Sequence, residues 1–147
     1  MATRARATIA DLDALDGKAE LVDGEIQLMP PAGFLPNQAS LVVAASLLAH
    51  SRRTRSGFAV TDNAGFRVNL PNRESFSPDA AFYTGPRTGM KFLEGAPTFA
   101  AEVRSENDYG PAAEAEMRQK RADYFAAGAL VVWDVDLLSD DVVRVYR

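Results

Sequence analysis

The sequence has no cysteine and only one histidine among its 147 residues. Without thiols the chain can form neither disulfide bonds nor a thiolate metal site, which excludes the disulfide-stapled class of small secreted domains. This composition fits the reducing cytoplasm, and that is where we expect the protein to act.

Long apolar runs are missing as well. The longest, residues 41–49, includes Ser46 and is far shorter than the roughly 20 residues that span a bilayer. The N-terminus is basic and then amphipathic, without the apolar centre of a signal peptide. We therefore expect a soluble protein that does not associate with membranes.

Positive charge is scarce: 16 Lys and Arg against 20 Asp and Glu give a net charge of −4. An acidic surface argues against bulk binding of nucleic acid. Local positive charge exists where Arg52, Arg53 and Arg55 follow one another. These arginines can contact a polyanion, or they can complement the carbonyl end of a helix. The sequence leaves both interpretations open.

The chain is long enough for one domain with a real core, and we expect a single domain over residues 1–147. A hydrophobic content of 47% excludes a disordered tail or a fibrous repeat. The order of elements predicts an α+β fold with a mixed sheet and helices on its faces. The expected helices are 8–15, 37–51 and 111–127, and the expected strands are 20–22, 25–29, 58–60, 66–68, 78–83, 99–104, 129–135 and 142–146.

Glycine, proline and Asp-Gly residues predict where several helices and strands begin or end. Asp23-Gly24 between two alternating runs predicts a hairpin, and residues 71–74 predict a turn. Pro111 at a first helical position and Gly128 after a last one predict the ends of a long helix.

The helix expected over residues 37–51 is apolar on nearly all sides. Such a helix is buried on more than one face or lies in an oligomer interface. We therefore expect a homo-oligomer, a dimer in the simplest case, with this helix in the contact. The residues concerned are Leu41, Val42, Val43, Leu47 and Leu48.

Two carboxylates stand out on the expected strands. Strand alternation gives Glu102 and Arg104 one face, inside an otherwise apolar segment. A carboxylate there is costly unless it is paired, hydrogen-bonded or bound to a metal, so a buried salt bridge with Arg104 or another cation competes with a functional role. Asp79 follows a proline, and it can be an ordinary strand-entry residue or a second functional acid.

Lys120 is the third unusual residue. At the helical period it shares a stripe with Ala113, Met117 and Tyr124, which suit the core. A lysine there can snorkel to solvent. Alternatively its ammonium points toward the two carboxylates, making a cation site with an electrostatic clamp for phosphate.

The same segments resemble the Uma-two family of restriction-type endonucleases, within the PD-(D/E)XK nuclease superfamily. The resemblance runs in order from about Glu20 to the C-terminus. It is carried by Glu20-Leu21-Val22-Asp23-Gly24-Glu25-Ile26, Ser77-Pro78-Asp79-Ala80-Ala81-Phe82, Ala101-Glu102-Val103-Arg104-Ser105, Lys120-Arg121-Ala122-Asp123-Tyr124-Phe125-Ala126-Ala127-Gly128 and Val132-Trp133-Asp134-Val135-Asp136.

The resemblance implies that Asp79 and Glu102 are acidic metal ligands and that Glu20 completes their cluster. The superfamily lysine would stand where this chain has Arg104, and Lys120 resembles that lysine in a relocated position. A histidine common near the start of the family's long helix is replaced here by Asn37-Gln38. Relatives continue past the position of Arg147 with a strand pair and a helix, so the resemblance implies a domain without that C-terminal extension.

These residues predict metal-assisted hydrolysis of a phosphodiester. Mg²⁺, with Mn²⁺ as a substitute, would be held by Asp79 and Glu102. Lys120 would position the attacking water, and Arg104 would hold a phosphate oxygen. The resemblance implies DNA rather than RNA as the substrate.

Two alternatives remain open. The chain can be a catalytically inactive, nuclease-like binding module that acts through an oligomer interface. Glu102, Arg104 and Lys120 can also form a purely structural ionic cluster, in which removing any one leaves its partners unpaired.

Overall fold

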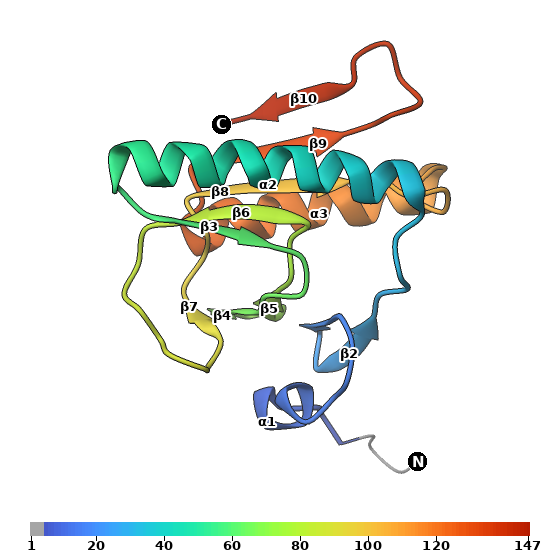
Figure 1. Cartoon of the computed structure of the whole chain (residues 1–147). Helices are drawn as coiled ribbons and strands as arrows, with labels where there is room; N and C mark the ends of the chain where they lie inside the picture. Colours follow the sequence, from blue (N-terminus) through green and yellow to red (C-terminus); the bar gives the residue numbers. More distant parts are fainter. Residues whose placement is uncertain (1–4) are drawn as a thin grey trace.

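The computed structural model describes residues 5–147 and builds them into two five-stranded sheets with three helices (Figure 1). In chain order the elements are α1 (Ile9–Asp13), β1 (Ala19–Val22), β2 (Glu25–Leu28), α2 (Phe34–Thr54), β3 (Phe58–Thr61), β4 (Phe66–Leu70), β5 (Arg73–Phe76), β6 (Ala80–Tyr83), β7 (Leu93–Glu94), β8 (Phe99–Val103), α3 (Pro111–Ala127), β9 (Val131–Val135) and β10 (Val143–Tyr146).

Both sheets are mixed. Sheet A has the strand order β2-β1-β5-β4-β7, and sheet B has the order β10-β9-β8-β6-β3. One pair in each sheet is parallel, β4 with β7 and β8 with β9, while the remaining pairs are antiparallel. The predicted α+β class and mixed sheet are confirmed. The prediction of one sheet is corrected, because the N-terminal hairpin pairs with β5 and builds the separate sheet A.

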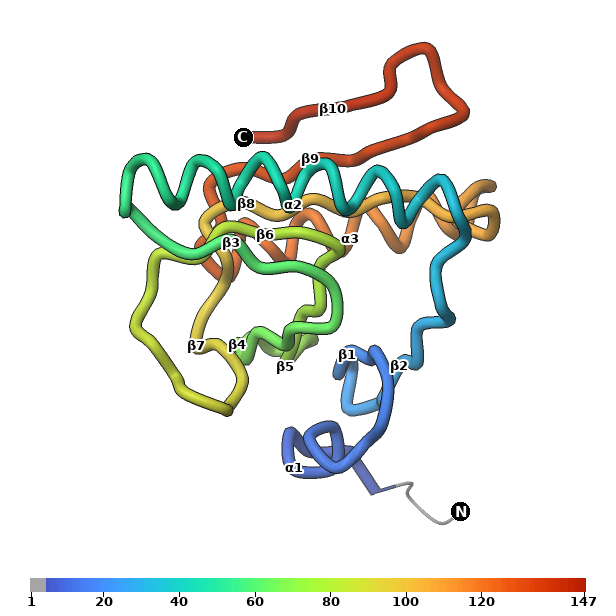
Figure 2. The backbone as a smooth tube through the Cα atoms, viewed as in Figure 1, coloured from blue at the N-terminus to red at the C-terminus, as the bar shows by residue number. Residues whose placement is uncertain are grey.

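Helices α2 and α3 cover opposite faces of sheet B (Figure 2). On the α2 face, Phe82 meets the ring of His50 with 5.4 Å between centroids. On the other face, Ala81, Ala100 and Val132 pack with Tyr124 of α3 in the main core. The Tyr124 ring stacks on Phe76 of sheet A at 4.0 Å, so α3 is wedged between the two sheets.

Local sequence explains the element boundaries. Asp23 and Gly24 both have positive φ, 51° and 73°, as a two-residue hairpin turn requires. Pro111 opens α3, and Gly128 ends it in the left-handed region with φ 114°. These predicted boundaries are confirmed, as is the Thr8 cap of α1.

Helix α2 is longer than predicted and is exposed rather than buried. Within α2 only Ser40 is fully buried, while Leu41, Val42 and Leu48 are 58%, 68% and 42% exposed. Of the two alternatives predicted for this helix, burial on more than one face within the chain is therefore wrong, and the oligomer interface stays a prediction. Despite this apolar character, no helix in residues 5–147 has the length and hydropathy needed to cross a bilayer.

Strand β5 and the two-residue strand β7 are elements that the sequence did not indicate. Residues 71–74 were predicted as a turn, but Arg73 already begins a strand. Arg73 and Ser75 are 6% and 1% exposed, so polar side chains occupy positions where the alternation rule expects apolar ones. Buried ion pairs replace hydrophobic contacts there, and they hide the strand from a hydrophobic pattern.

Candidate active site

Asp79 and Glu102 meet on neighbouring strands of sheet B. Ala80 of β6 pairs with Ala101 of β8, so the antiparallel register carried one residue further sets Asp79 opposite Glu102. Both stand on the face that α3 covers. Oδ2 of Asp79 accepts a hydrogen bond from the Val103 backbone N–H at 2.6 Å, which ties this carboxylate to β8.

Lys120 of α3 points directly at this face. Its Nζ lies 2.8 Å from Oε1 of Glu102 and 2.9 Å from Oε2 of Glu20. The side chain is 14% exposed, so the lysine does not snorkel to solvent. The Tyr124 hydroxyl, one helical turn further, donates to the same Oε1 of Glu102 at 2.6 Å. Lys120 and Tyr124 therefore face sheet B together, as the helical periodicity predicted.

Glu20 is present at the site, but it is fully committed to protein contacts. Oε1 accepts from Nη1 of Arg73 at 3.0 Å, and Oε2 accepts from the Ser77 backbone N–H at 2.7 Å. Burial alone would raise the pKa of Glu20, but the adjacent Lys120 and Arg73 outweigh it and hold that pKa below its usual value. These contacts argue against the predicted metal-ligand role and make Glu20 a support for Lys120.

The contacts of Arg104 argue against its predicted role on phosphate. Nε and Nη2 donate to the two oxygens of Asp134 at 2.9 and 2.8 Å. The remaining donors go to Glu114 and to the backbone carbonyl of Asp108. All five guanidinium N–H groups are thus used, and none faces Glu102. Strand alternation correctly places Arg104 on the same sheet face as Glu102. Its long side chain, however, reaches Asp134 instead of the carboxylates of the site.

Lys18 and Asp62 belong to the site, although the sequence did not single them out. Nζ of Lys18 lies 2.8 Å from Oδ1 of Asp79 and 2.5 Å from Oδ1 of Asp62. The available signal was alternation, because Lys18 precedes Glu20 by two residues and so shares its strand face. Asp62 comes directly after β3, where an exposed polar residue is ordinary and attracts no notice.

Glu102 is the carboxylate whose charge the site tolerates least. Burial raises its pKa to about 6, and the neighbouring carboxylates of Asp79 and Glu20 add to the effect against the opposing pull of Lys120. Its Oε1 is held by Lys120 and Tyr124. Its Oε2 receives no hydrogen bond from any residue between 5 and 147. One oxygen of Glu102 is therefore free for a ligand.

The donor set suits a hard divalent cation that shares its coordination with water and substrate. Within the described chain no three Asp, Glu or His side chains are arranged to enclose a metal. Mg²⁺ usually takes only one or two carboxylates and completes its shell with water and phosphate oxygens. Asp79 and Glu102 supply two carboxylates. The pKa of Glu102 is raised chiefly by burial and further by the neighbouring carboxylates, and a bound cation would offset both effects. The residues thus fit Mg²⁺ in an open site.

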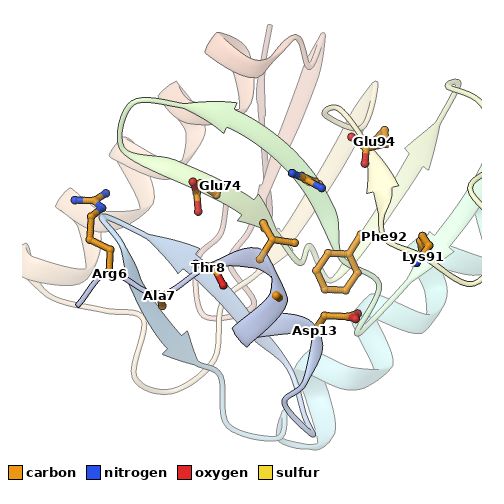
Figure 3. A pocket seen from close by; sticks show the side chains of 11 residues that line it. Arg6, Ala7, Thr8, Asp13, Glu74, Lys91, Phe92 and Glu94 are labelled. Atoms are coloured by element: carbon orange, nitrogen blue, oxygen red, sulfur yellow. The ribbon is translucent and has the colours of Figure 1, made fainter. Parts of the chain in front are cut away.

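The site faces a cleft of about 730 Å³. Its walls come from the β1–β2 hairpin, the start of α2 and one side of α3, and Lys18, Asp62, Asp79, Glu102 and Lys120 all line it. A second hollow of about 640 Å³ lies beside α1 against sheet A (Figure 3). Its lining mixes Glu74, Glu94 and Lys91, and it contains none of the predicted site residues.

The arginines at the end of α2 lie away from this cleft. The first turns of α2 border the cleft through Pro36 and Ser40. At 1.5 Å per residue, Arg53 lies about 20 Å beyond Ser40 along the helix. Arg52 and Arg53 occupy the last turn, where positive charge complements the helix carbonyls. Their position favours the helix-end interpretation over contact with a ligand in this cleft.

Comparisons with known proteins bear on the fold and on the family of this chain. A crystal structure from Anabaena variabilis, described as a "putative nuclease", aligns with a TM-score of 0.72 over 95% of this chain and 79% of that one. The two share 18% of aligned residues, so the likeness shows a common fold. No curated protein matches the sequence. The family model Uma2, described as "putative restriction endonuclease", matches residues 7–147. Because that match spans nearly the whole sequence, the chain belongs to the Uma2 family.

Proposed function

We propose that the protein is a metal-dependent endonuclease that hydrolyses phosphodiester bonds, with DNA as its substrate. The observation that carries the proposal is the convergence of Asp79, Glu102 and Lys120 on one cleft, with Nζ of Lys120 2.8 Å from Glu102. Two carboxylates and a lysine are the groups that metal-assisted phosphodiester hydrolysis needs.

Each residue has a defined task in this proposal. Asp79 and the free Oε2 of Glu102 would hold Mg²⁺, which, when bound, lowers the pKa of a coordinated water and neutralises charge on the phosphate. Tyr124 fixes Glu102 by its hydrogen bond to Oε1. Lys120 orients the attacking water and offers positive charge to the crowded phosphate. Arg73 and Glu20 hold Lys120 in place from behind, since Glu20 contacts both cations.

The preference for DNA rests on the family description, which names restriction endonucleases. The site itself contributes local cations, although the chain as a whole has a net charge of −4. An acidic protein of this kind works on a polyanion through local positive charge and a bound metal rather than through a basic surface. The absence of cysteine supports a cytoplasmic setting for this activity.

We further propose that the active protein is a homodimer. The outward side of α2 exposes Leu41, Val42 and Leu48, and Val143 and Val145 of β10 are 41% and 46% exposed. In Figure 1 strand β10 lies on the same side of the molecule as α2. Exposed apolar residues gathered on one side are typical of an interface between subunits.

The decisive test is cleavage of plasmid and linear DNA by purified protein with Mg²⁺, with Mn²⁺ and with EDTA. Asp79→Asn and Glu102→Gln are expected to abolish metal-dependent cleavage. Glu25→Gln serves as the matched control, because Glu25 is an exposed carboxylate on β2 outside the cleft lining. Robust cleavage in EDTA, or full activity of Glu102→Gln, overturns the proposal.

The second candidate function is an inactive binding module, and the exposed apolar side of α2 is the observation that favours it. A module of this kind binds Mn²⁺ weakly, cleaves neither DNA nor RNA, and still self-associates. The cleavage assay and isothermal titration with Mn²⁺, run on the same preparations, therefore separate the two functions together.

A further inference from the structure

Lys18 contacts the oxygen of Asp79 that does not accept the Val103 backbone N–H. Oδ2 of Asp79 is taken by the Val103 N–H, and Oδ1 lies 2.8 Å from Nζ of Lys18. The lysine side chain is 17% exposed, so this is a largely desolvated ion pair rather than a loose surface contact. The carboxylate proposed as a metal ligand is therefore already neutralised by a cation of the protein.

The contrast with Glu102 makes this arrangement informative. Glu102 keeps one oxygen free, while neither oxygen of Asp79 is free of a protein partner. A divalent cation that takes Oδ1 of Asp79 as a ligand meets the ammonium of Lys18 there. Two cations at one carboxylate oxygen repel each other strongly where burial limits screening by water.

Asp62 is a second ion-pair partner of Lys18. Oδ1 of Asp62 lies 2.5 Å from Nζ of Lys18, and the Asp62 side chain is 33% exposed. Lys18 can therefore release Asp79 without losing its ion pair, by remaining on Asp62. Among residues 5–147, Asp62 and Asp79 are the only carboxylates within salt-bridge distance of this ammonium.

We propose that Lys18 is a built-in competitor of the metal, which holds Asp79 in the metal-free protein and withdraws onto Asp62 when a divalent cation binds. This inference rests on the proposed function and adds regulation of metal binding to it. Lys18 keeps the acids neutralised at low metal concentration and raises the concentration at which the site fills.

The test is a titration of Mn²⁺ into full-length proteins by isothermal calorimetry. Lys18→Met is expected to bind Mn²⁺ on the order of 10-fold more tightly than the wild type, because one close positive charge is gone. Asp62→Asn is expected to bind on the order of 10-fold more weakly, since Lys18 is then left with Asp79 alone. Lys91→Met is the matched control: Lys91 is exposed and lines the other hollow, and its loss leaves the affinity within about 2-fold.

Thermal unfolding with and without Mn²⁺ supplies an independent readout. Lys18→Met should unfold at a lower temperature than the wild type without metal, and saturating Mn²⁺ should close most of that gap. A purely structural lysine gives the same gap in both conditions. Lys18→Gln repeats the comparison with a polar side chain if the methionine variant does not fold.

The outcomes separate this inference from the function on which it rests. If the wild type binds no Mn²⁺, the metal-dependent function fails and the role of Lys18 fails with it. If the wild type binds Mn²⁺ but Lys18→Met binds equally or more weakly, the nuclease proposal survives and the competitor role is overturned.

Discussion

At the scale of single residues, burial of Glu102 disfavours the ionised carboxylate that its proposed role as a metal ligand requires. Its pKa of about 6 lies above the ordinary value of 4.5, so the folded protein holds the proton of this carboxyl more tightly than the unfolded chain does. A carboxyl with a raised pKa destabilises the folded state once it ionises. The cost is therefore absent below about pH 4.5 and complete above about pH 6.

This sign leads to a test with Glu102→Gln, which mimics the protonated acid. Without metal at pH 8 the variant is expected to be more stable than the wild type by about 2 kcal/mol. The difference should shrink as the pH falls from 6 to 5. Urea unfolding at several pH values measures it. A variant less stable than the wild type at pH 8 would show that Glu102 acts mainly as a structural ion-pair partner of Lys120.

Lys120 combines a structural and a catalytic task, which changes what its removal should do. Lys120→Met leaves Glu20, only 2% exposed, with one cation fewer, so we expect a loss of about 3 kcal/mol in stability. We also expect turnover to fall on the order of 100-fold to 1,000-fold. The loss of stability comes from the contact of Lys120 with buried Glu20, which the helical stripe of Lys120 does not indicate.

The double variant Glu20→Gln/Lys120→Met separates the two tasks of Lys120. It removes the buried carboxylate together with the lysine, and Arg73 keeps its ion pair with Asp123, so stability should largely return while turnover stays lost. Chemical denaturation and a cleavage assay on the same preparations report the two effects. Recovery of turnover along with stability would reduce Lys120 to a structural residue.

At the scale of elements, Arg104 joins the parallel strands β8 and β9 to the first turn of α3. Asp134 is 3% exposed, and its oxygens accept from two guanidinium nitrogens of Arg104. Removing one partner of a buried pair costs about 3–5 kcal/mol, which is what we expect for Arg104→Met in urea unfolding. Arg52→Met, on an exposed helix end, should change stability by less than about 0.5 kcal/mol. If Arg104→Met instead keeps its stability and loses only activity, the phosphate contact predicted from the sequence is restored.

Predictability from the sequence also differed between elements. Helix α3 and the hairpin were predictable because Pro111, Gly128 and Asp23-Gly24 impose backbone geometry locally. Strand β5 was not, since Arg73 is buried by partners 50 and 53 residues away in the sequence. The same distinction applies to the site. Glu102 and Lys120 were found because each breaks an apolar pattern, while Lys18 sits at a strand end, where a lysine breaks none.

At the scale of the whole molecule, the proposed dimer can be tested through α2. Val42 is 68% exposed, so Val42→Glu should leave the fold of the subunit intact while placing charge in the proposed interface. We expect the wild type to sediment as a dimer and Val42→Glu as a monomer. Met90→Glu is the control. Met90 is a fully exposed apolar residue outside α2 and β10, so this variant should remain dimeric. A wild-type protein that is monomeric at high concentration contradicts the dimer.

The site is assembled from parts that are distant in the chain, and this has a consequence for folding kinetics. Lys18 and Asp79 are 61 residues apart, and Glu20 and Arg73 are 53 apart. Closing such long loops costs chain entropy, so we expect these contacts to form late and the clustered carboxylates to repel one another only after the main folding barrier has been crossed. A bound cation should then act on the native state alone. In stopped-flow experiments, Mn²⁺ is expected to slow unfolding and to leave the refolding rate nearly unchanged; accelerated refolding would mean that the acids already meet in the transition state.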